Sequence, residues 1–289
     1  PTPDMVIICP TQLLAKAERL AQIHRDHDNY DVLVLDQKDI FNEFSSGTPD
    51  AMAYRLMLKM FYDRNPEKLK HLLLFGGGYF DHRQLSKHLG ENYLLTFQSS
   101  NSYNIISTYV SDDFFGTLGD NTGLNITAES VNIGVGRLPV LNEQEADQMI
   151  DKIEAYINNT DYSNWRNKIL IMEESGDDNI HMYQGADLLK TLATTSSADI
   201  DVKKYHIESF ILSNGIARGA HNGVASVLQL AEFFQQGALY VTYMGHGGGG
   251  GISNSGVWNI NKVLETPIPR LPVISMAACD IANFDSGVR

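Results

Sequence analysis

The sequence predicts an α/β fold, in which a parallel-rich sheet is flanked by helices and the chain forms two subdomains. Short apolar runs with β-branched residues, such as Met5–Cys9, alternate with amphipathic stretches along the chain. This alternation is typical of parallel strands joined by right-handed crossovers. A polar segment, NNTDYSN at residues 158–164, interrupts it. We therefore expect one subdomain at residues 1–160 and a second at residues 165–289.

Helix-start signals place the helices of the first half. Thr11 is expected to cap the helix that follows the first strand. Thr48 and Pro49 are expected to be the cap and the first residue of the next helix. Asn142, with Glu145 three residues later, begins a third helix in a capping-box-like pattern. The strands expected in this half are Met5–Cys9, 32–35, His71–Phe75 and 131–136, the last of them buried.

The second half shows the same alternation of strands and helices, and it ends in two apolar runs, at residues 238–244 and 272–276. Both runs are bounded by Gly or Pro and contain β-branched or aromatic residues. That pattern is typical of strands buried on both faces of a parallel sheet. The other elements expected in this half are strands at residues 168–172 and 202–206 and helices at residues 186–193 and 224–234.

Each of the two apolar runs is followed by a reactive side chain. His246 follows the first run, and Cys279 follows the second, 33 residues later. Ligands of open α/β sheets bind beyond the carboxyl ends of the strands, so His246 and Cys279 meet there if the strands are neighbours. An imidazole that takes the thiol proton produces a nucleophile for acyl transfer. The alternative is a histidine bonded to the backbone and a cysteine that is a small core residue.

The glycines after His246 leave backbone N–H groups unobstructed. The amides of Gly247 and Cys279 are the expected donors to a developing oxyanion, and Gly248 is expected to contact substrate. A glycine-rich loop can instead cradle phosphate. Gly247–Gly251 lacks the spacing of either common phosphate-binding motif, and no lysine follows it.

Several stretches resemble the gingipain family of cysteine peptidases, peptidase family C25. Around the two reactive residues they are the Gly245-His246-Gly247 turn and the approach of Ala277 and Ala278 to Cys279. The resemblance extends through nearly the whole chain, and it implies a caspase-like, gingipain-like fold. The further stretches are NEFSSGTPDAMAYRLMLKMFYDR (42–64), LLLFGGGYFDHR (72–83), SDDFFG (111–116), VNIGVGRLPV (131–140), DDNIHMYQGADLL (177–189) and CDIANFD (279–285).

The resemblance also implies roles for acidic residues in the second half. Glu173 follows a strand, as the acid near the histidine does in gingipains, so it is a candidate to orient His246; an exposed loop carboxylate is the alternative. Asp178 falls where Arg-specific gingipains place the acid that binds a substrate arginine. The gap between Glu173 and Asp178 is shorter here than in the Arg-specific gingipains, so arginine specificity is not expected.

Two other histidines are expected to have local roles. His181 is expected to pack or hydrogen-bond locally, and His82 either ends a tight turn or lines the same cleft.

Within the family, the chain is most similar to the signal peptidase, or sortase, of bacterial type IX secretion. This implies a cysteine endopeptidase that cleaves C-terminal signal domains from exported proteins. It also implies other secretion components as partners and a location at the bacterial cell surface or outer membrane. The alternative is a non-catalytic interaction or scaffold domain of a secretion apparatus that keeps the gingipain fold.

Composition narrows the classes of partner. A net charge of −13 argues against nucleic acid and anionic membrane surfaces as partners. No apolar run is long enough to span a membrane. The two cysteines, Cys9 and Cys279, cannot make a disulfide framework, and Cys9 is expected to be a buried structural thiol.

No cofactor is required by this chemistry, while the resemblance allows structural Ca²⁺. The polar loop at residues 99–125 carries Asp112, Asp113, Asp120 and Asn121, whose oxygens suit Ca²⁺; a solvated surface loop is the alternative. The chain begins without Met and ends ten residues after Cys279. We therefore expect a piece of a longer protein, truncated after the cysteine.

Overall fold

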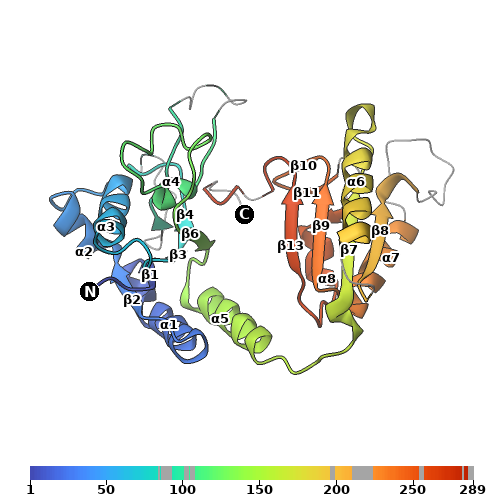
Figure 1. The fold of residues 1–289 in the computed structure, drawn as a ribbon, viewed down its shortest axis with the longest axis horizontal. Coiled ribbons are helices and arrows are strands. Elements are labelled where there is room, and N and C mark those ends of the chain that lie inside the picture. Colours follow the sequence, from blue (N-terminus) through green and yellow to red (C-terminus); the bar gives the residue numbers. More distant parts are fainter. Residues whose placement is uncertain are drawn as a thin grey trace. The chain divides into compact units, whose positions relative to one another are not determined.

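The computed structural model describes residues 1–83, 85, 93–100, 104, 108–195, 199–209, 224–253, 257–281 and 283–285. The chain forms two compact units (Figure 1). Unit 1 contains Pro1–Asn158 and the described residues of Phe284–Arg289, and unit 2 contains Asn159–Asn283. The chain therefore returns to unit 1 shortly after Cys279, at residues that the sequence division placed in the second subdomain.

Unit 1 is built on a four-stranded parallel sheet with the order β2-β1-β3-β6. The central strand β1 is completely buried, because five apolar residues in succession serve both faces of the sheet. A two-residue pair, β4 with β5, continues beyond β3. The bounds of these strands are β1 Met5–Cys9, β2 Val32–Asp36, β3 His71–Phe75, β4 Gly77–Gly78, β5 Tyr93–Leu94 and β6 Gly134–Leu138.

Helices cover both faces of the unit 1 sheet. On one face Ile7 and Phe75 pack against α1 and α5; on the other face Ile8 and Leu74 pack against α2 and α3. This alternation follows from the period of two along each strand. The helices of the unit are α1 Leu14–Asp28, α2 Gln37–Phe44, α3 Ala51–Arg64, α4 Asp113–Gly116 and α5 Glu143–Ile157, with a short 3₁₀ helix, η1, at Thr11–Leu13.

Two of the three predicted helix caps are wrong. Thr11 lies inside η1, and no side chain caps either η1 or α1. Helix α3 begins two residues after Pro49, and Asp50 caps it by accepting from the Met52 N–H. The third cap is confirmed, because Asn142 accepts from the Glu145 N–H at 2.9 Å.

In unit 1 the sequence analysis also misplaced the start of one strand and missed two helices, α2 and α4. Strand β6 begins at Gly134, three residues later than predicted, and its residues are half-buried or exposed rather than buried. Helix α2, Gln37–Phe44, was not predicted; Asp36 caps it by accepting from the Lys38 N–H. It is only eight residues long, and Ile40 and Phe41 are its buried apolar residues.

Residues from the far end of the chain complete unit 1. The Phe80 N–H donates to the Asp285 carbonyl at 3.1 Å, and Gln98 Nε2 donates to the Asp285 carboxylate at 2.8 Å. The guanidinium of Arg137 lies over the Phe284 ring, 4.8 Å from its centroid. These contacts attach Phe284 and Asp285, five and six residues after Cys279, to unit 1.

Unit 2 contains a second four-stranded parallel sheet, with the order β13-β9-β7-β8. A small antiparallel sheet, β10-β11-β12, follows β9. The strands of unit 2 are β7 Lys168–Glu173, β8 Asp201–His206, β9 Tyr240–Met244, β10 Gly247–Gly248, β11 Gly251–Ile252, β12 Trp258–Asn259 and β13 Val273–Ala277. Its helices are α6 Ile180–Thr195, α7 Val224–Gln236 and α8 Ile260–Glu265, with short 3₁₀ segments η2 Asn164–Asn167, η3 Asp177–Asn179 and η4 Ile207–Ser209.

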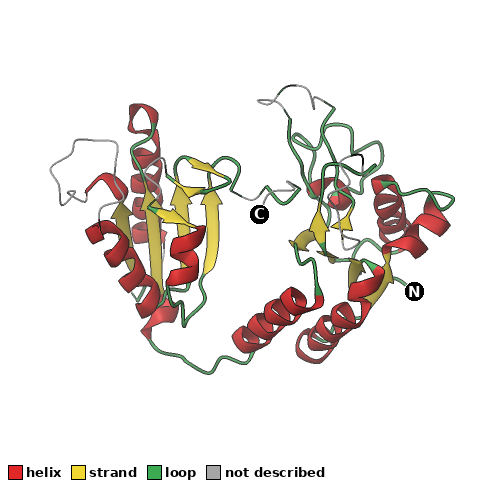
Figure 2. Cartoon of the chain, turned by 180° about the vertical axis from the view of Figure 1, so that it is seen from behind, coloured by secondary structure: helices red, strands yellow, loops and turns green. Residues whose placement is uncertain are grey.

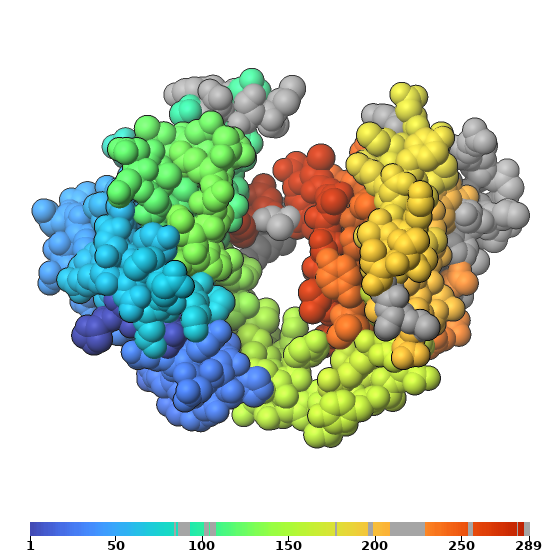
Figure 3. All heavy atoms as spheres, viewed as in Figure 1, coloured from blue at the N-terminus to red at the C-terminus, as the bar shows by residue number. Residues whose placement is uncertain are grey.

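Helices α6 and α7 lie on opposite faces of the unit 2 sheet (Figure 2). Leu170 and Val241 pack with Phe234 of α7, whereas Glu173 and Ile171 face Gly185 of α6. The prediction that both apolar runs are buried on both faces is wrong for the second. Strand β13 is an edge strand whose five residues are all exposed, and it lies at the surface of unit 2 (Figure 3).

The predicted α/β fold with parallel sheets flanked by helices is confirmed by this architecture. Among the described residues, no helix has the length and apolar character needed to cross a bilayer.

Candidate active site

The two predicted reactive residues follow neighbouring strands of unit 2. Strands β9 and β13 pair in parallel, and their last paired residues are Met244 and Ala277. The Gly245 N–H extends this pairing by donating to the Ala277 carbonyl at 3.3 Å. His246 and Cys279 each lie two residues beyond the end of their strand. The register therefore brings both residues to the same edge of the sheet.

The turn that carries His246 packs against the segment that carries Cys279. A Cβ placed on Gly247 would lie 2.9 Å from the Ala278 Cβ and 2.6 Å from Ile281 Cγ1, so only glycine fits there. Asp280, directly after Cys279, has a left-handed backbone with φ of 51°. The chain thus turns sharply after Cys279, whose side chain is exposed while His246 is half-buried.

Three groups fix the backbone of His246. The Glu174 carboxylate accepts from the His246 N–H. The Tyr243 hydroxyl donates to the His246 carbonyl at 2.7 Å, and the Ser253 N–H donates to the same carbonyl at 2.8 Å. Both backbone polar groups of His246 are therefore satisfied within the protein. We refer to Glu174, Tyr243 and Ser253 as the histidine clamp.

Burial makes the histidine clamp sensitive to substitution. Tyr243 and Glu174 are both buried. Desolvation, with a smaller contribution from the negative charge of Glu174, raises the pKa of Tyr243, so its hydroxyl stays protonated and donates. A buried carboxylate requires hydrogen-bond donors, and the His246 N–H is one for Glu174.

Glu173, the predicted partner of His246, faces the other way. Its carboxylate is fully buried, 2.6 Å from Lys204 Nζ and 3.3 Å from His206 Nδ1. Gly185 of α6 lies so close to Oε2 that a Cβ there would overlap it. The contacts of the described residues join His246 to Glu174 and not to Glu173. The role of Glu173 in orienting His246 thus stays a prediction.

Alternation along β7 explains the difference between these two glutamates. Glu173 shares a face with Ile171, whereas Glu174 has the parity of Leu170 and Met172, which pack in the same cluster as Tyr243. The sequence analysis named Glu173 and missed Glu174. Parity along the strand was the signal that could have distinguished them.

The start of α6 adds a second histidine to the site. The His181 ring meets the His246 ring edge-on, with centroids 5.6 Å apart. His181 Nδ1 also lies 3.2 Å from Gln184 Oε1, which confirms the expected local packing and hydrogen bonding. Asp178, the predicted substrate contact, is exposed three residues before His181 and has a left-handed φ of 53°.

The glycine loop after His246 has open space around Gly248–Gly250, and strand pairing with β11 orders its backbone. A Cβ on Gly248, Gly249 or Gly250 would meet no atom within 4 Å. Gly247 and Gly248 pair with Ile252 and Gly251 of β11. The Ser253 N–H donates to the His246 carbonyl directly before this paired segment.

In the described part of the polar loop at residues 99–125, which leaves out residues 101–103 and 105–107, two of the candidate calcium ligands pair with cations. Asp112 Oδ2 is bound by Arg137 Nε at 2.7 Å, and Asp120 Oδ1 by Lys59 Nζ at 2.9 Å. Across the described ranges, no three His, Cys, Asp or Glu side chains could together hold a metal ion. Structural calcium therefore stays a prediction.

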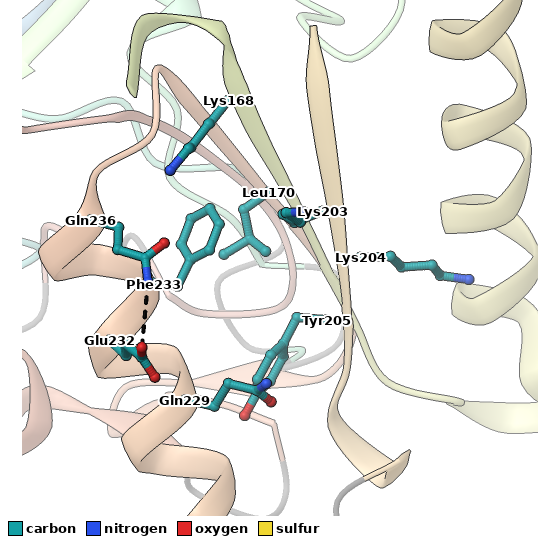
Figure 4. A pocket seen from close by; sticks show the side chains of 9 residues that line it. All are labelled: Lys168, Leu170, Lys203, Lys204, Tyr205, Gln229, Glu232, Phe233 and Gln236. Atoms are coloured by element: carbon teal, nitrogen blue, oxygen red, sulfur yellow. Dashed lines mark hydrogen bonds between the residues drawn. The ribbon is translucent and has the colours of Figure 1, made fainter. Parts of the chain in front are cut away.

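A separate cavity of about 280 Å³ lies in unit 2, between α7 and strands β7 and β8 (Figure 4). Leu170, Tyr205 and Phe233 form its apolar side, and the ammonium groups of Lys168 and Lys203 lie at its rim. None of the predicted site residues lines this cavity.

The α/β fold and the histidine and cysteine that follow neighbouring strands are those expected of a cysteine peptidase. The whole chain, residues 1–289, matches the profile described as peptidase family C25. The chain therefore belongs to peptidase family C25. Peptidases of this family act on protein substrates.

Solved structures support the fold. The Arg-specific cysteine proteinase gingipain R (RgpB) is 16% identical, with a TM-score of 0.69, over 98% of this chain and 56% of that one. The complex of Porphyromonas gingivalis RgpB pro- and mature domains is 16% identical, with a TM-score of 0.65, over 95% of this chain and 55% of that one. The chain thus spans little more than half of these gingipain chains.

Dimeric latent PorU from Porphyromonas gingivalis is 42% identical, with a TM-score of 0.48, over 54% of this chain and 16% of that one. The curated proteins include no significant match to the chain.

Proposed function

We propose that the protein is a cysteine endopeptidase in which Cys279 is the nucleophile and His246 transfers the proton. The observation that carries this proposal is the parallel pairing of β9 with β13, which brings both residues to one edge of the sheet. The contact of Gly247 with Ala278 and Ile281 supports it, because the histidine turn lies against the cysteine segment.

The proposed reaction proceeds by acyl transfer. His246 takes the proton of the Cys279 thiol, and sulfur attacks the scissile carbonyl carbon. The N–H groups of Gly247 and Cys279 stabilise the resulting oxyanion. Protonated His246 then gives its proton to the departing amine, leaving a thioester on Cys279. Water or an amine acceptor attacks the thioester and releases the thiol.

The proposed substrates are exported proteins that carry a C-terminal secretion signal domain, processed at the bacterial cell surface with other secretion components. The resemblance along the chain supports this finer assignment, including the stretches around Cys279 and at residues 42–64. The proposed contacts to substrate are the open loop at Gly248 and the exposed carboxylate of Asp178.

The test is cleavage of a reporter protein fused to such a signal domain. The parent protein should release the signal domain, and Cys279→Ala and His246→Ala should not. A folded parent protein that binds the fusion without cleaving it would instead indicate the scaffold domain. Cleavage by Cys279→Ala would contradict the assignment of the nucleophile.

A further inference from the structure

Unit 1 has a cavity at the carboxyl edge of its own sheet. The cavity measures about 610 Å³. Its lining follows three neighbouring strands: Thr11 comes after β1, Lys38 after β2 and His82 after β3 and β4. Strand β1 lies between β2 and β3, so the β1–β2 and β2–β3 connections run in opposite directions across the sheet. Open α/β sheets bind ligands at such a switch point.

A second cavity, of about 290 Å³, extends the first. The two cavities share Pro49, His82 and Leu95 in their linings. Phe97 and Phe114 are among the walls of the smaller one, which also include the Asp50 side chain at the cap of α3. We refer to the two cavities together as the unit 1 groove.

The walls of the unit 1 groove are held in place by hydrogen bonds. Gln37 Nε2 donates to the Tyr93 carbonyl at 3.0 Å, and its Oε1 accepts from the Tyr54 hydroxyl at 2.7 Å. The Thr96 N–H donates to His82 Nε2 at 3.1 Å, which requires a neutral ring with its proton on Nδ1. A preformed groove binds a ligand without the entropy cost of ordering its walls.

The charge of the larger cavity selects the ligand. Lys38 is the one charged side chain among its lining residues, all of which are described. It is exposed, and no acidic group of the described residues pairs with its ammonium. Lys38 lies in the first turn of α2, whose N-terminus is already capped by the Asp36 carboxylate, so the Lys38 ammonium is the group that would attract an anion. The remaining polar lining includes the side-chain amides of Gln12 and Asn42, which suit a peptide backbone.

We propose that unit 1 binds a short peptide by its free C-terminal carboxylate. Lys38 pairs with the carboxylate in the larger cavity, and an apolar side chain of the peptide enters the smaller cavity beside Phe97 and Phe114. The lining of this site belongs to unit 1, whereas both Cys279 and His246 belong to unit 2.

Calorimetric titration tests the site with two probes, N-acetyl-Phe-Leu and the same dipeptide as its C-terminal amide. The full chain carries Cys279→Ala, so that neither probe is cleaved. The free acid should bind about tenfold more tightly than the amide, since one charge pair distinguishes them. Lys38→Met should remove that difference. Lys152→Met, at an exposed lysine of α5 outside the groove, should preserve it.

A second variant tests the location independently of charge. Asn42→Trp places an indole in the larger cavity from an exposed helix position and should abolish binding of both probes. Circular dichroism confirms that each variant is folded. Equal affinities for acid and amide, no binding to the folded parent, or unchanged binding to Lys38→Met or Asn42→Trp would each overturn the proposal.

Discussion

At the scale of single residues, the site depends on which of two adjacent glutamates contacts His246. Glu174 accepts from the His246 N–H, while Glu173 pairs with Lys204. Both are buried at the end of one strand: Glu173 is the last residue of β7, and Glu174 follows it. The sequence could place an acid at this strand end, but the contact with His246 requires the packing of Tyr243 beside Glu174.

Exchanging each glutamate for glutamine separates their roles. Glu174→Gln should lower kcat about tenfold with little change in KM, because a charged hydrogen bond that positions His246 becomes a neutral one. Glu173→Gln should lower stability, since Lys204 loses its partner, and leave kcat close to that of the parent. Steady-state kinetics and chemical denaturation of both variants provide the readouts. A loss of kcat in Glu173→Gln alone would assign the orienting role to Glu173.

A glycine pair in the same loop offers a matched steric test. A Cβ on Gly245 would lie 2.8 Å from Glu174 Cγ and closer still to the Tyr243 hydroxyl, whereas one on Gly249 would meet no atom within 4 Å. Gly245→Ala should therefore disrupt the histidine clamp and lower activity about a hundredfold, comparable to losing an essential catalytic orientation. Gly249→Ala should retain near-parent activity. Equal activities of the two variants, measured with the signal-domain reporter, would argue against the clamp.

At the scale of elements, strand positions were largely predictable, and helix starts and exposures were not. Strands β1 and β3 were predicted at their observed bounds, because uninterrupted apolar runs identify buried parallel strands. Helix α2 was missed because it is short and mostly polar. The exposure of β13 could not be predicted, since its apolar sequence is the same whether or not a neighbour covers it.

One buried ion pair joins several elements of unit 1. Arg137 of β6 binds both carboxylate oxygens of Asp112, at 2.7 and 2.8 Å, and its Nη1 donates to the Gly76 carbonyl. The pair is buried, with side-chain exposures of 5% and 12%. Its removal therefore leaves an uncompensated charge among the strand ends of the unit.

Arg137→Met should lower the free energy of unfolding by about 3–5 kcal/mol, since it leaves the Asp112 carboxylate buried without a partner. The double variant Arg137→Met/Asp112→Leu should recover part of that loss, because it removes both charges. Urea denaturation followed by far-UV circular dichroism measures both. A single variant within about 1 kcal/mol of the parent would show that the pair contributes little.

At the scale of the whole molecule, each unit has its own sheet, and the chain passes between the units twice. The second passage follows Cys279, and Phe284 and Asp285 are fixed in unit 1 by Arg137 and Gln98. No feature of the sequence predicted this return, because the contacts involved join residues separated by more than 140 positions.

Buried acids that keep their protons give both units a common response to alkali. Desolvation raises the pKa of Tyr54 in unit 1 and of Tyr243 in unit 2. The unfolded chain loses these protons near pH 10, while the folded chain retains them, so the contribution of these two groups to stability is constant below about pH 9 and falls above it.

Tyr54→Phe should be less stable than the parent at neutral pH, because Gln37 loses the Tyr54 donor. Above about pH 10 its stability should fall less steeply, by about 1.4 kcal/mol per pH unit, since one titrating group has been removed. Urea midpoints across this range check the slope. Parallel slopes for the two proteins would show that Tyr54 does not titrate in the unfolding reaction.

The central claim is that His246 activates Cys279, and the alkylation rate of Cys279 at neutral pH tests it most directly. Burial, with the nearby Asp36 charge, raises the pKa of Cys9 to about 12, so Cys9 serves as an unreactive internal reference. Cys279 should react at least about tenfold faster than a model thiol, and His246→Gln should reduce it to the model rate while the control His27→Gln does not. A parent Cys279 no faster than the model thiol, or a rate unchanged in His246→Gln, would contradict the account.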